Sequence, residues 1–182
     1  MSVRASPRAG RRGRAGRGRS ARAARGTSTS VLTWSGIASS SRLARSSSTA
    51  RVATPAGFAK VDADDDYAYR ATTAHGVVIA TRTNPNKLQG NLDFWKESVD
   101  LKLRDSGYVL DDKGERDVTT SSGLKGKQLR YTTTKNGREH AYWVTVFVTK
   151  KRVVVVEAGG DKTPFAKAQG AVDAAISTLE AD

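Results

Sequence analysis

The sequence predicts an α+β domain in which a meandering antiparallel β-sheet packs between helices, an α/β/α sandwich, preceded by a disordered N-terminal tail. Three observations predict it. Strand-like and helical patterns follow in the order strand, strand, helix, several strands, helix. An Asn-Gly pair at 136–137 separates two alternating runs, as in a type I′ hairpin. Residues 153–156 are four valines, as expected of a central strand covered on both faces.

Charge is distributed unevenly along the chain. The 182 residues carry a formal net charge of +13, and residues 1–60, with 12 arginines, one lysine and no acid, account for all of it. Residues 61–182 balance 18 basic against 18 acidic side chains. The domain therefore offers no electrostatic footprint for nucleic acid or anionic lipid. The absence of cysteine excludes disulfides, thiolate metal sites and cysteine nucleophiles.

Residues 1–54 are rich in Arg, Ala, Gly and Ser, a composition that cannot offset the entropy of ordering the chain, so we expect a disordered tail. Three interpretations stay open. The tail is a nucleic-acid arm that tracks phosphates, a targeting segment, or the product of a mis-set start with Val31 or Val52 as the true initiation site. Its apolar stretch at 31–38 is far shorter than the roughly 20 residues that span a bilayer.

A single domain is expected over residues 55–182. Residues 67–73 and 77–83 have the β-branched and aromatic content of two strands, joined at His75-Gly76 as a first hairpin. The Asn-Pro-Asn sequence at 84–86 should break the second strand.

A helix follows. Asn91 is a suitable N-cap, and Gly107 ends the pattern. The apolar residues at helical spacing between them are Leu92, Trp95, Val99 and Leu103. This pattern indicates an amphipathic helix that lies on the sheet.

The remaining strands form a meander. Residues 108–110 are extended and 111–114 have turn composition, whereas 128–134 and 141–149 flank the Asn-Gly hairpin. After the central strand, Gly159-Gly160 predicts a turn into a terminal helix with Thr163 as N-cap and Pro164 in its first turn. Its apolar face comprises Phe165, Ala168, Val172, Ile176 and Leu179.

Motifs for metal binding or catalysis fail on spacing. The aspartates that suggest a calcium loop are Asp62, Asp64, Asp65 and Asp66, but Tyr67 and Thr73 stand where the loop needs Gly and Glu. His75 and His140 lie in or beside turns without a second ligand at i+4. Residues 123–127 lack the spacing of a phosphate loop and lead into a strand. We expect no metal, cofactor or catalytic residue.

Charged residues also occur within the predicted strands, namely Arg70, Arg82, Arg130 and Glu157. They either face solvent or pair across the sheet. Alternatively, Arg82 and Glu157, with Tyr142 or Trp143 nearby, line a small-molecule pocket on the sheet face.

The meander resembles the PsbP/DcrB-like (Mog/PsbP-type) group of small α/β/α sandwich domains over about residues 55–181. The segments that carry the resemblance are 107–110, 123–131, 135–137, 142–148 and 153–160. The resemblance implies a non-enzymatic accessory module, in bacteria often exported and tethered as a lipoprotein, which favours a place outside the cytoplasm. This chain departs from the lipoprotein form because it has no cysteine to carry the lipid.

We therefore expect a non-enzymatic binding or accessory domain, envelope-associated or exported, that acts through contacts with a protein partner. Two alternatives remain: nucleic-acid binding through the Arg-rich tail, and a small-molecule site on the sheet face at Arg82 and Glu157.

Overall fold

The computed structural model of the chain describes residues 50–63 and 66–181. The expected disordered tail falls almost wholly outside them. The described elements are β1 (Ala59–Lys60), β2 (Tyr69–Thr72), β3 (Val78–Pro85), α1 (Leu92–Asp105), β4 (Val109–Thr119), β5 (Lys125–Lys135), β6 (Arg138–Val148), β7 (Arg152–Asp161) and α2 (Lys162–Ser177).

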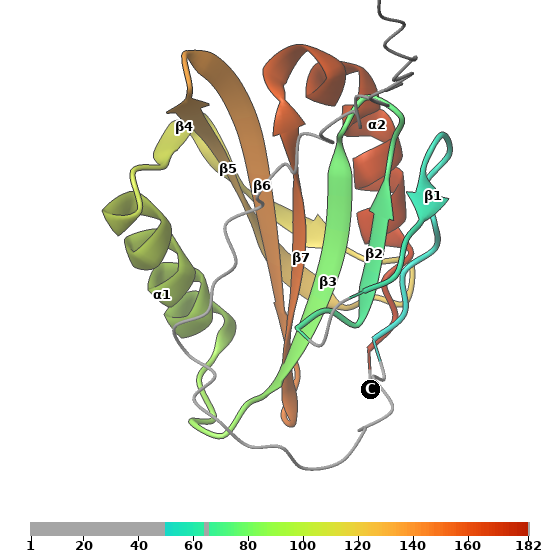
Figure 1. Ribbon diagram of the computed structural model, residues 1–182. Helices are drawn as coiled ribbons and strands as arrows, with labels where there is room; N and C mark the ends of the chain where they lie inside the picture. The colour runs from blue at the N-terminus through green and yellow to red at the C-terminus, as the bar shows by residue number, and fades with distance from the viewer. Residues whose placement is uncertain (1–49, 64–65, 182) are drawn as a thin grey trace, which may run out of the picture.

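The strands form one antiparallel sheet in the order β1-β2-β3-β7-β6-β5-β4. The last strand of the sequence, β7, thus lies at the centre of the sheet between β3 and β6 (Figure 1). Helix α1 connects β3 to the far edge strand β4, and the chain then returns through the meander to the centre. The predicted antiparallel meander is confirmed.

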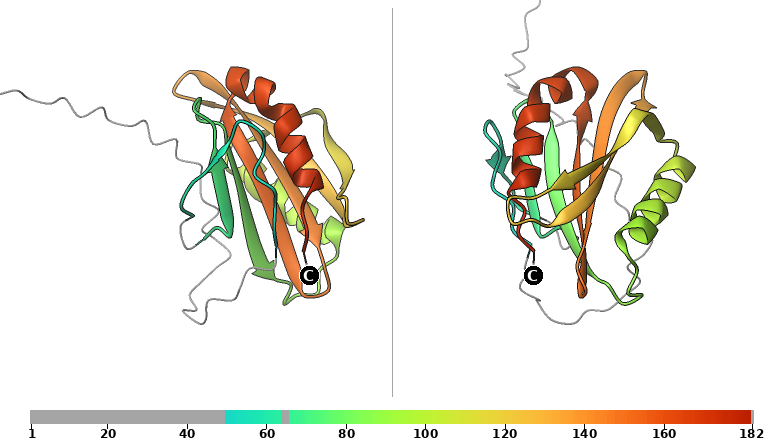
Figure 2. Two further views of the ribbon diagram at one scale, coloured as in Figure 1. Left: turned by 90° about the vertical axis from the view of Figure 1, so that its right-hand side faces the viewer. Right: turned by 180° about the vertical axis from the view of Figure 1, so that it is seen from behind.

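The two helices lie on opposite faces of this sheet (Figure 2). Because side chains alternate along a strand, Val153 and Val155 of β7 join the core beneath α1, and Val154 and Val156 join the core beneath α2. None of these four valines is more than 3% exposed. We call the two sides of the sheet the α1 face and the α2 face. The expected α/β/α sandwich is confirmed.

Two local signals act as the sequence predicts. The Asn91 side chain accepts a hydrogen bond from the backbone N–H of Phe94 at 2.8 Å and so caps α1. Asn136 and Gly137 have φ angles of 51° and 73°, the positive pair that a type I′ turn requires. Both signals use only neighbouring residues, which is why they can be recognised in the sequence.

The turn expected at 111–114 is instead an irregularity within a single strand. β4 runs from Val109 to Thr119, and its register against β5 shifts between Leu110 and Glu115. As an edge strand, β4 has a partner on one side only, so extra residues can bulge without breaking a second ladder. Gly114 is required there, because a Cβ would lie 2.7 Å from the backbone oxygen of Arg130.

The expected turn at Gly159-Gly160 is also wrong. Both glycines lie within β7, opposite Tyr142 and Ala141 of β6. Hydrogen bonding to the neighbouring strands β3 and β6 extends β7 through these glycines. Helix α2 begins directly after β7 at Lys162, and its N-cap is Asp161 and not the expected Thr163.

The chain before residue 55 contacts the end of α2. Ala50 is buried, and Arg51 forms an antiparallel bridge with Glu180. The backbone N–H of Ala53 donates to Thr178 Oγ1 at 2.9 Å. Neither α1 nor α2, the helices of the described part of the chain, has the length and apolar character needed to cross a bilayer.

Packing at Gly126 predicts that Gly126→Ala lowers the free energy of unfolding by about 1–3 kcal/mol in urea denaturation. A Cβ at this position would lie 2.5 Å from Cδ1 of Phe147 and 2.7 Å from the backbone oxygen of Val146. The control is Gly170→Ala on α2, where a Cβ meets nothing within 4 Å and a gain of roughly 0.5–1 kcal/mol is expected. Equal effects at both positions would contradict the packing of β5 against β6.

Candidate functional site

Arg82 and Glu157 come together on the α1 face of the sheet. They lie on the neighbouring strands β3 and β7, where Arg82 stands opposite Val155 and Glu157 opposite Ala80. Nη2 of Arg82 lies 3.3 Å from Oε2 of Glu157, and the two side chains are 8% and 3% exposed. The sequence-based interpretation that these residues pair across the sheet agrees with this geometry.

Tyr67, in the loop before β2, completes the pair. Its hydroxyl accepts a hydrogen bond from Nη2 of Arg82 at 2.5 Å and donates one to Oε2 of Glu157 at 3.4 Å. Its ring also lies against the guanidinium, with 4.4 Å between Cζ of Arg82 and the ring centroid. Sequence reasoning missed Tyr67, because the path of a loop over a sheet leaves no periodic signal.

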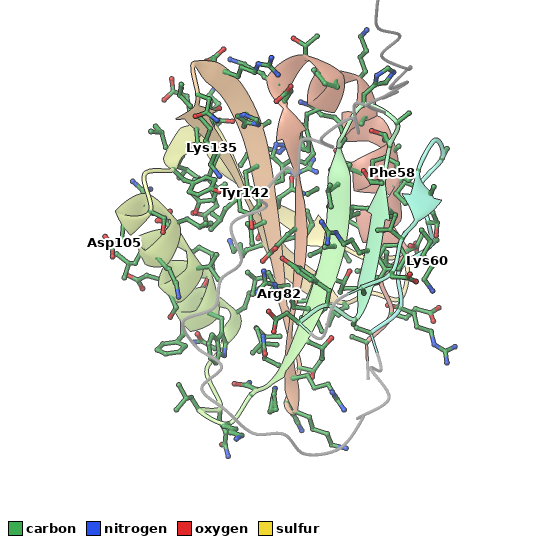
Figure 3. All side chains as sticks on the ribbon, in the orientation of Figure 1. Phe58, Lys60, Arg82, Asp105, Lys135 and Tyr142 are labelled. Carbon is green, nitrogen blue, oxygen red and sulfur yellow. The ribbon has the colours of Figure 1, made fainter. Side chains whose placement is uncertain are left out.

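Tyr142 of β6 belongs to the same group. Its hydroxyl acts on Glu157 in favour of the ionised carboxylate and so lowers the pKa of Glu157, against the larger effect of burial. Its ring packs at 5.0 Å from that of Tyr108, and Tyr108 packs in turn at 6.3 Å from Tyr131. Figure 3 labels Arg82 and Tyr142, which lie along the middle of the sheet. We call Tyr67, Arg82, Tyr142 and Glu157 the buried ionic cluster.

Burial dominates the electrostatics of this cluster. Loss of solvent raises the pKa of Glu157 above its ordinary value, against the opposing effects of Arg82 and the tyrosine hydroxyls. Burial likewise raises the pKa of Tyr142 well above its ordinary value. The pKa of Arg82 is also raised, because the attraction of Glu157 and the contacts with Tyr67 together outweigh its loss of solvent.

In chemical terms the buried ionic cluster is a charge pair whose carboxylate is held inside the core. The carboxylate of Glu157 is bonded by Arg82 and the Tyr67 hydroxyl, and its side chain is 3% exposed. A general acid or base must reach the proton that it transfers. The geometry therefore supports a role in fixing the register of β3 and β7 more directly than a role in proton transfer.

Trp143, the fourth candidate residue, lies on the opposite side of the sheet from the other three. It follows Tyr142 in β6, and successive side chains of a strand point to opposite faces. On the α2 face its ring contacts Phe165 of α2 at a centroid distance of 5.0 Å, and the Arg130 guanidinium lies over it. The structure brings Arg82, Glu157 and Tyr142 together and places Trp143 elsewhere.

Residue spacing in the sequence argues against a calcium loop at residues 62–66 and against a histidine metal site. Within residues 50–63 and 66–181, no three His, Asp or Glu side chains are placed to hold one ion. Asp64 and Asp65 lie outside the described residues. Nδ1 of His140 lies 3.2 Å from a carboxylate oxygen of Asp161, a surface pair at the end of β7.

A different feature is prominent on the outer side of α1. Leu88, Phe94 and Leu101 are 71%, 46% and 59% exposed. Phe94 and Leu101 are seven residues apart and so share one side of the helix, opposite the buried Val99. We call these three residues the outer α1 stripe. The signal in the sequence is that Phe94 and Leu101 lie off the inward-facing pattern of Leu92, Trp95, Val99 and Leu103.

No protein-family model matches the chain, and no curated protein matches it in sequence. Solved structures similar to it include a Bacteroides thetaiotaomicron protein at 12% identity and a TM-score of 0.49, covering 74% of this chain and 45% of that one. A Pseudomonas aeruginosa protein of unknown function is 16% identical, with a TM-score of 0.44 and coverage of 69% and 81%.

The solution structure of a cyanobacterial PsbP from Synechocystis is also similar, at 9% identity and a TM-score of 0.49, covering 80% of this chain and 99% of that one. A PsbP protein is thus among the solved structures that this chain is similar to. The chain spans less than half the length of the Bacteroides protein.

Removing the cation of the buried ionic cluster should cost much more than removing an exposed one. Arg82→Met leaves a buried carboxylate without its cation and is expected to lower the free energy of unfolding by about 3–5 kcal/mol, measured in urea. Arg82→Met with Glu157→Leu should recover part of that loss. The control is Lys162→Met, since its partner Glu139 is 58% exposed, and a change below about 1 kcal/mol is expected. Similar losses of unfolding free energy in Arg82→Met and Lys162→Met would contradict the conclusion that Arg82 neutralises a buried carboxylate.

The raised pKa of Glu157 predicts a pH dependence of stability. Above its ordinary value of 4.5, the folded state holds this proton more tightly than the unfolded state does. The carboxylate therefore costs stability as the pH rises through that window, with a limiting slope of about 1.4 kcal/mol per pH unit. Glu157→Gln removes this titration, so the free energy of unfolding of the wild type, minus that of the variant, should fall as the pH rises above 4.5. A difference that rises with pH would show a lowered pKa.

Proposed function

We propose that this chain is a non-enzymatic binding domain that acts through contacts between the outer α1 stripe and a protein partner. The observation that carries the proposal is the exposure of Phe94 and Leu101 on one side of a helix that is already packed by its other side, with Leu88 exposed in the segment before the helix. The sheet does not use these side chains, because the core beneath α1 is filled by Val99 with Leu92, Trp95 and Leu103 packed against it.

Grouping distinguishes this surface from ordinary exposed apolar residues. Single exposed apolar side chains are common on soluble proteins, whereas adjacent ones mark interaction sites. Phe94 stands in the first turn of α1, Leu101 lies two turns further on, and Leu88 precedes the helix. Val109, 67% exposed, follows at the start of β4. Exposed apolar side chains thus occur before, on and just after α1.

The charges beside the stripe indicate the chemistry of the partner. Asp93, Glu97 and Asp105 are exposed on α1 around Phe94 and Leu101, whereas the exposed Lys87 lies beside Leu88 before the helix. The nearby Arg104 is bound to Asp100 at 2.8 Å and offsets that carboxylate. The complementary surface is therefore apolar with basic side chains at its border. We infer a protein partner of that character.

The buried ionic cluster favours binding over catalysis. Its carboxylate and guanidinium bond to each other and to the Tyr67 hydroxyl within the core. An envelope or exported location is part of the proposal, and it is supported by the PsbP-like resemblance of residues 55–181.

The test places a photo-crosslinking amino acid at Leu101 in the full chain, expressed in its native cells, with Lys167 of α2 as the matched exposed control position. One discrete adduct is expected at position 101 and none at 167, in the envelope or exported fraction. Sedimentation of the purified chain first establishes whether the partner is a second copy.

Binding to the purified partner should then weaken at least about tenfold on Phe94→Ser or Leu101→Ser, since each removes buried apolar contact. Glu97→Lys should weaken it through like charges, and stability should change by less than about 0.5 kcal/mol. Equal adducts at both positions, or affinity indifferent to Glu97→Lys, would reject the stripe as the interface. Hydrolytic turnover that disappears with Glu157→Gln would reject the non-enzymatic proposal.

A further inference from the structure

Two arginines converge on the α2 face, at the side of the sheet that α2 leaves open. Helix α2 packs over β6 and β7, whereas Arg116 and Arg130 belong to β4 and β5. The register places Arg116 opposite Gln128, and Arg130 opposite Trp143. Both arginines are partly accessible, with side chains 39% and 26% exposed.

A buried amide holds both guanidinium groups. The Nε groups of Arg116 and Arg130 donate to the same Oε1 atom of Gln128, at 2.7 Å and 2.9 Å. Gln128 is fully buried, and its amide nitrogen donates to Thr145 Oγ1 at 3.1 Å, which fixes the orientation of the amide. Each guanidinium is thus anchored at Nε, and its outer nitrogens, Nη1 and Nη2, are not used by Gln128.

Trp143 forms the floor of this arrangement. Cζ of Arg130 lies 3.9 Å from the centroid of the Trp143 ring, and Cζ of Arg116 lies 5.9 Å from it. Stacking on an indole restricts the guanidinium plane and so reduces the entropy lost when a ligand binds to it. The two arginines and Phe165 of α2 together cover Trp143, which is 3% exposed.

The positive charge at this place exceeds the neighbouring negative charge. Asp173 of α2 is the carboxylate in contact with both arginines: it is bonded to Arg116, and its second oxygen lies 3.7 Å from Nη2 of Arg130. Asp111 acts on Arg130 from further away, and its carboxylate accepts a hydrogen bond from Thr132. Burial, together with the like charge of Arg116, lowers the pKa of Arg130. Two cations share one directly contacting anion.

We propose that Arg116 and Arg130 form a binding site for an oxyanion, a phosphate or carboxylate group of a ligand. A guanidinium presents its outer N–H groups in a fork that matches two oxygens of such a group. Among the described residues, the Nη1 groups of both arginines have no hydrogen-bond partner. Asp173 occupies part of the site as an internal carboxylate, so a ligand oxyanion would share the arginines with it or replace it.

This site is independent of the outer α1 stripe, because it lies on the other face of the sheet. The alternative role is structural: Asp173 would bind the two arginines solely to fasten α2 to the sheet. The two roles predict opposite consequences of removing the Asp173 carboxylate when anions are present.

The experiment titrates the full chain with inorganic phosphate, and separately with acetate, at constant ionic strength. Binding is followed through the NMR signals of the arginine Nε–H groups, which report each site individually and so separate it from the arginines of residues 1–49. We expect saturable shifts of the Arg116 and Arg130 signals with both anions and tighter binding of phosphate. Arg130→Gln should weaken the response of Arg116 at least about tenfold, and the matched control Arg138→Gln, at an exposed hairpin, should leave it unchanged.

Asp173→Asn supplies the second measurement. Removal of the competing carboxylate should tighten phosphate binding about tenfold, and phosphate should raise the thermal midpoint of this variant more than that of the wild type. If the variant does not fold, the wild-type titration alone decides. Phosphate-induced shifts of the Arg116 and Arg130 signals that grow linearly without saturation would overturn the proposal, as would Arg116 shifts that persist in Arg130→Gln. An equal rise in thermal midpoint with phosphate in Asp173→Asn and in Asp173→Asn/Arg130→Gln would also overturn it.

Discussion

The structure depends on the burial of β7 from both sides. Val153 and Val155 enter the core under α1, and Val154 and Val156 enter the core under α2, so this strand cannot lie at an edge or on a sheet with one covered face. Burying a valine contributes roughly 1.5–3 kcal/mol, and the strand buries four in a row. A helix is therefore required on each face. The connection of α1 across the sheet, and the return of the chain through the meander, satisfy that requirement.

The same alternation determines where the charges lie. Glu157 follows the valines and takes the α1 face in a position where water is excluded, so it must have a cation inside the protein. Arg82 supplies the cation from β3, and the Tyr67 hydroxyl donates to Oε2 of Glu157, the oxygen that Arg82 also contacts. A carboxylate held in this way specifies the pairing of β3 with β7, because a slip of one residue would turn Glu157 toward the other core.

The two arginines of the α2 face illustrate the opposite situation. Arg116 and Arg130 are anchored by Gln128 and stacked on Trp143, but their outer nitrogens reach the partly open side of the sheet, and Asp173 contacts both. In the buried ionic cluster the cation and the anion face each other within the core. Arg116 and Arg130, by contrast, are held in place by Gln128 and Trp143 and remain partly exposed to solvent. The outer α1 stripe lies on the solvent side of the α1 layer, across the sheet from the two arginines. The molecule thus presents an apolar surface and a cationic one on opposite sides of a rigid sheet.

The sequence by itself determined the elements whose signals are local: the capped helix after Asn91, the Asn136-Gly137 hairpin, and the central position of a strand of four valines. For Arg82 and Glu157 it left solvent exposure, pairing across the sheet and a pocket all open. Tertiary structure decided the rest. The bulge of β4 at 111–114 and the extension of β7 through Gly159 and Gly160 follow from how many partner strands each has. The contact of Tyr67 with Arg82, and of Arg130 with Trp143, follows from a loop path and a strand register. Periodicity reports which residues share a face, but only the assembled sheet decides which neighbours that face meets.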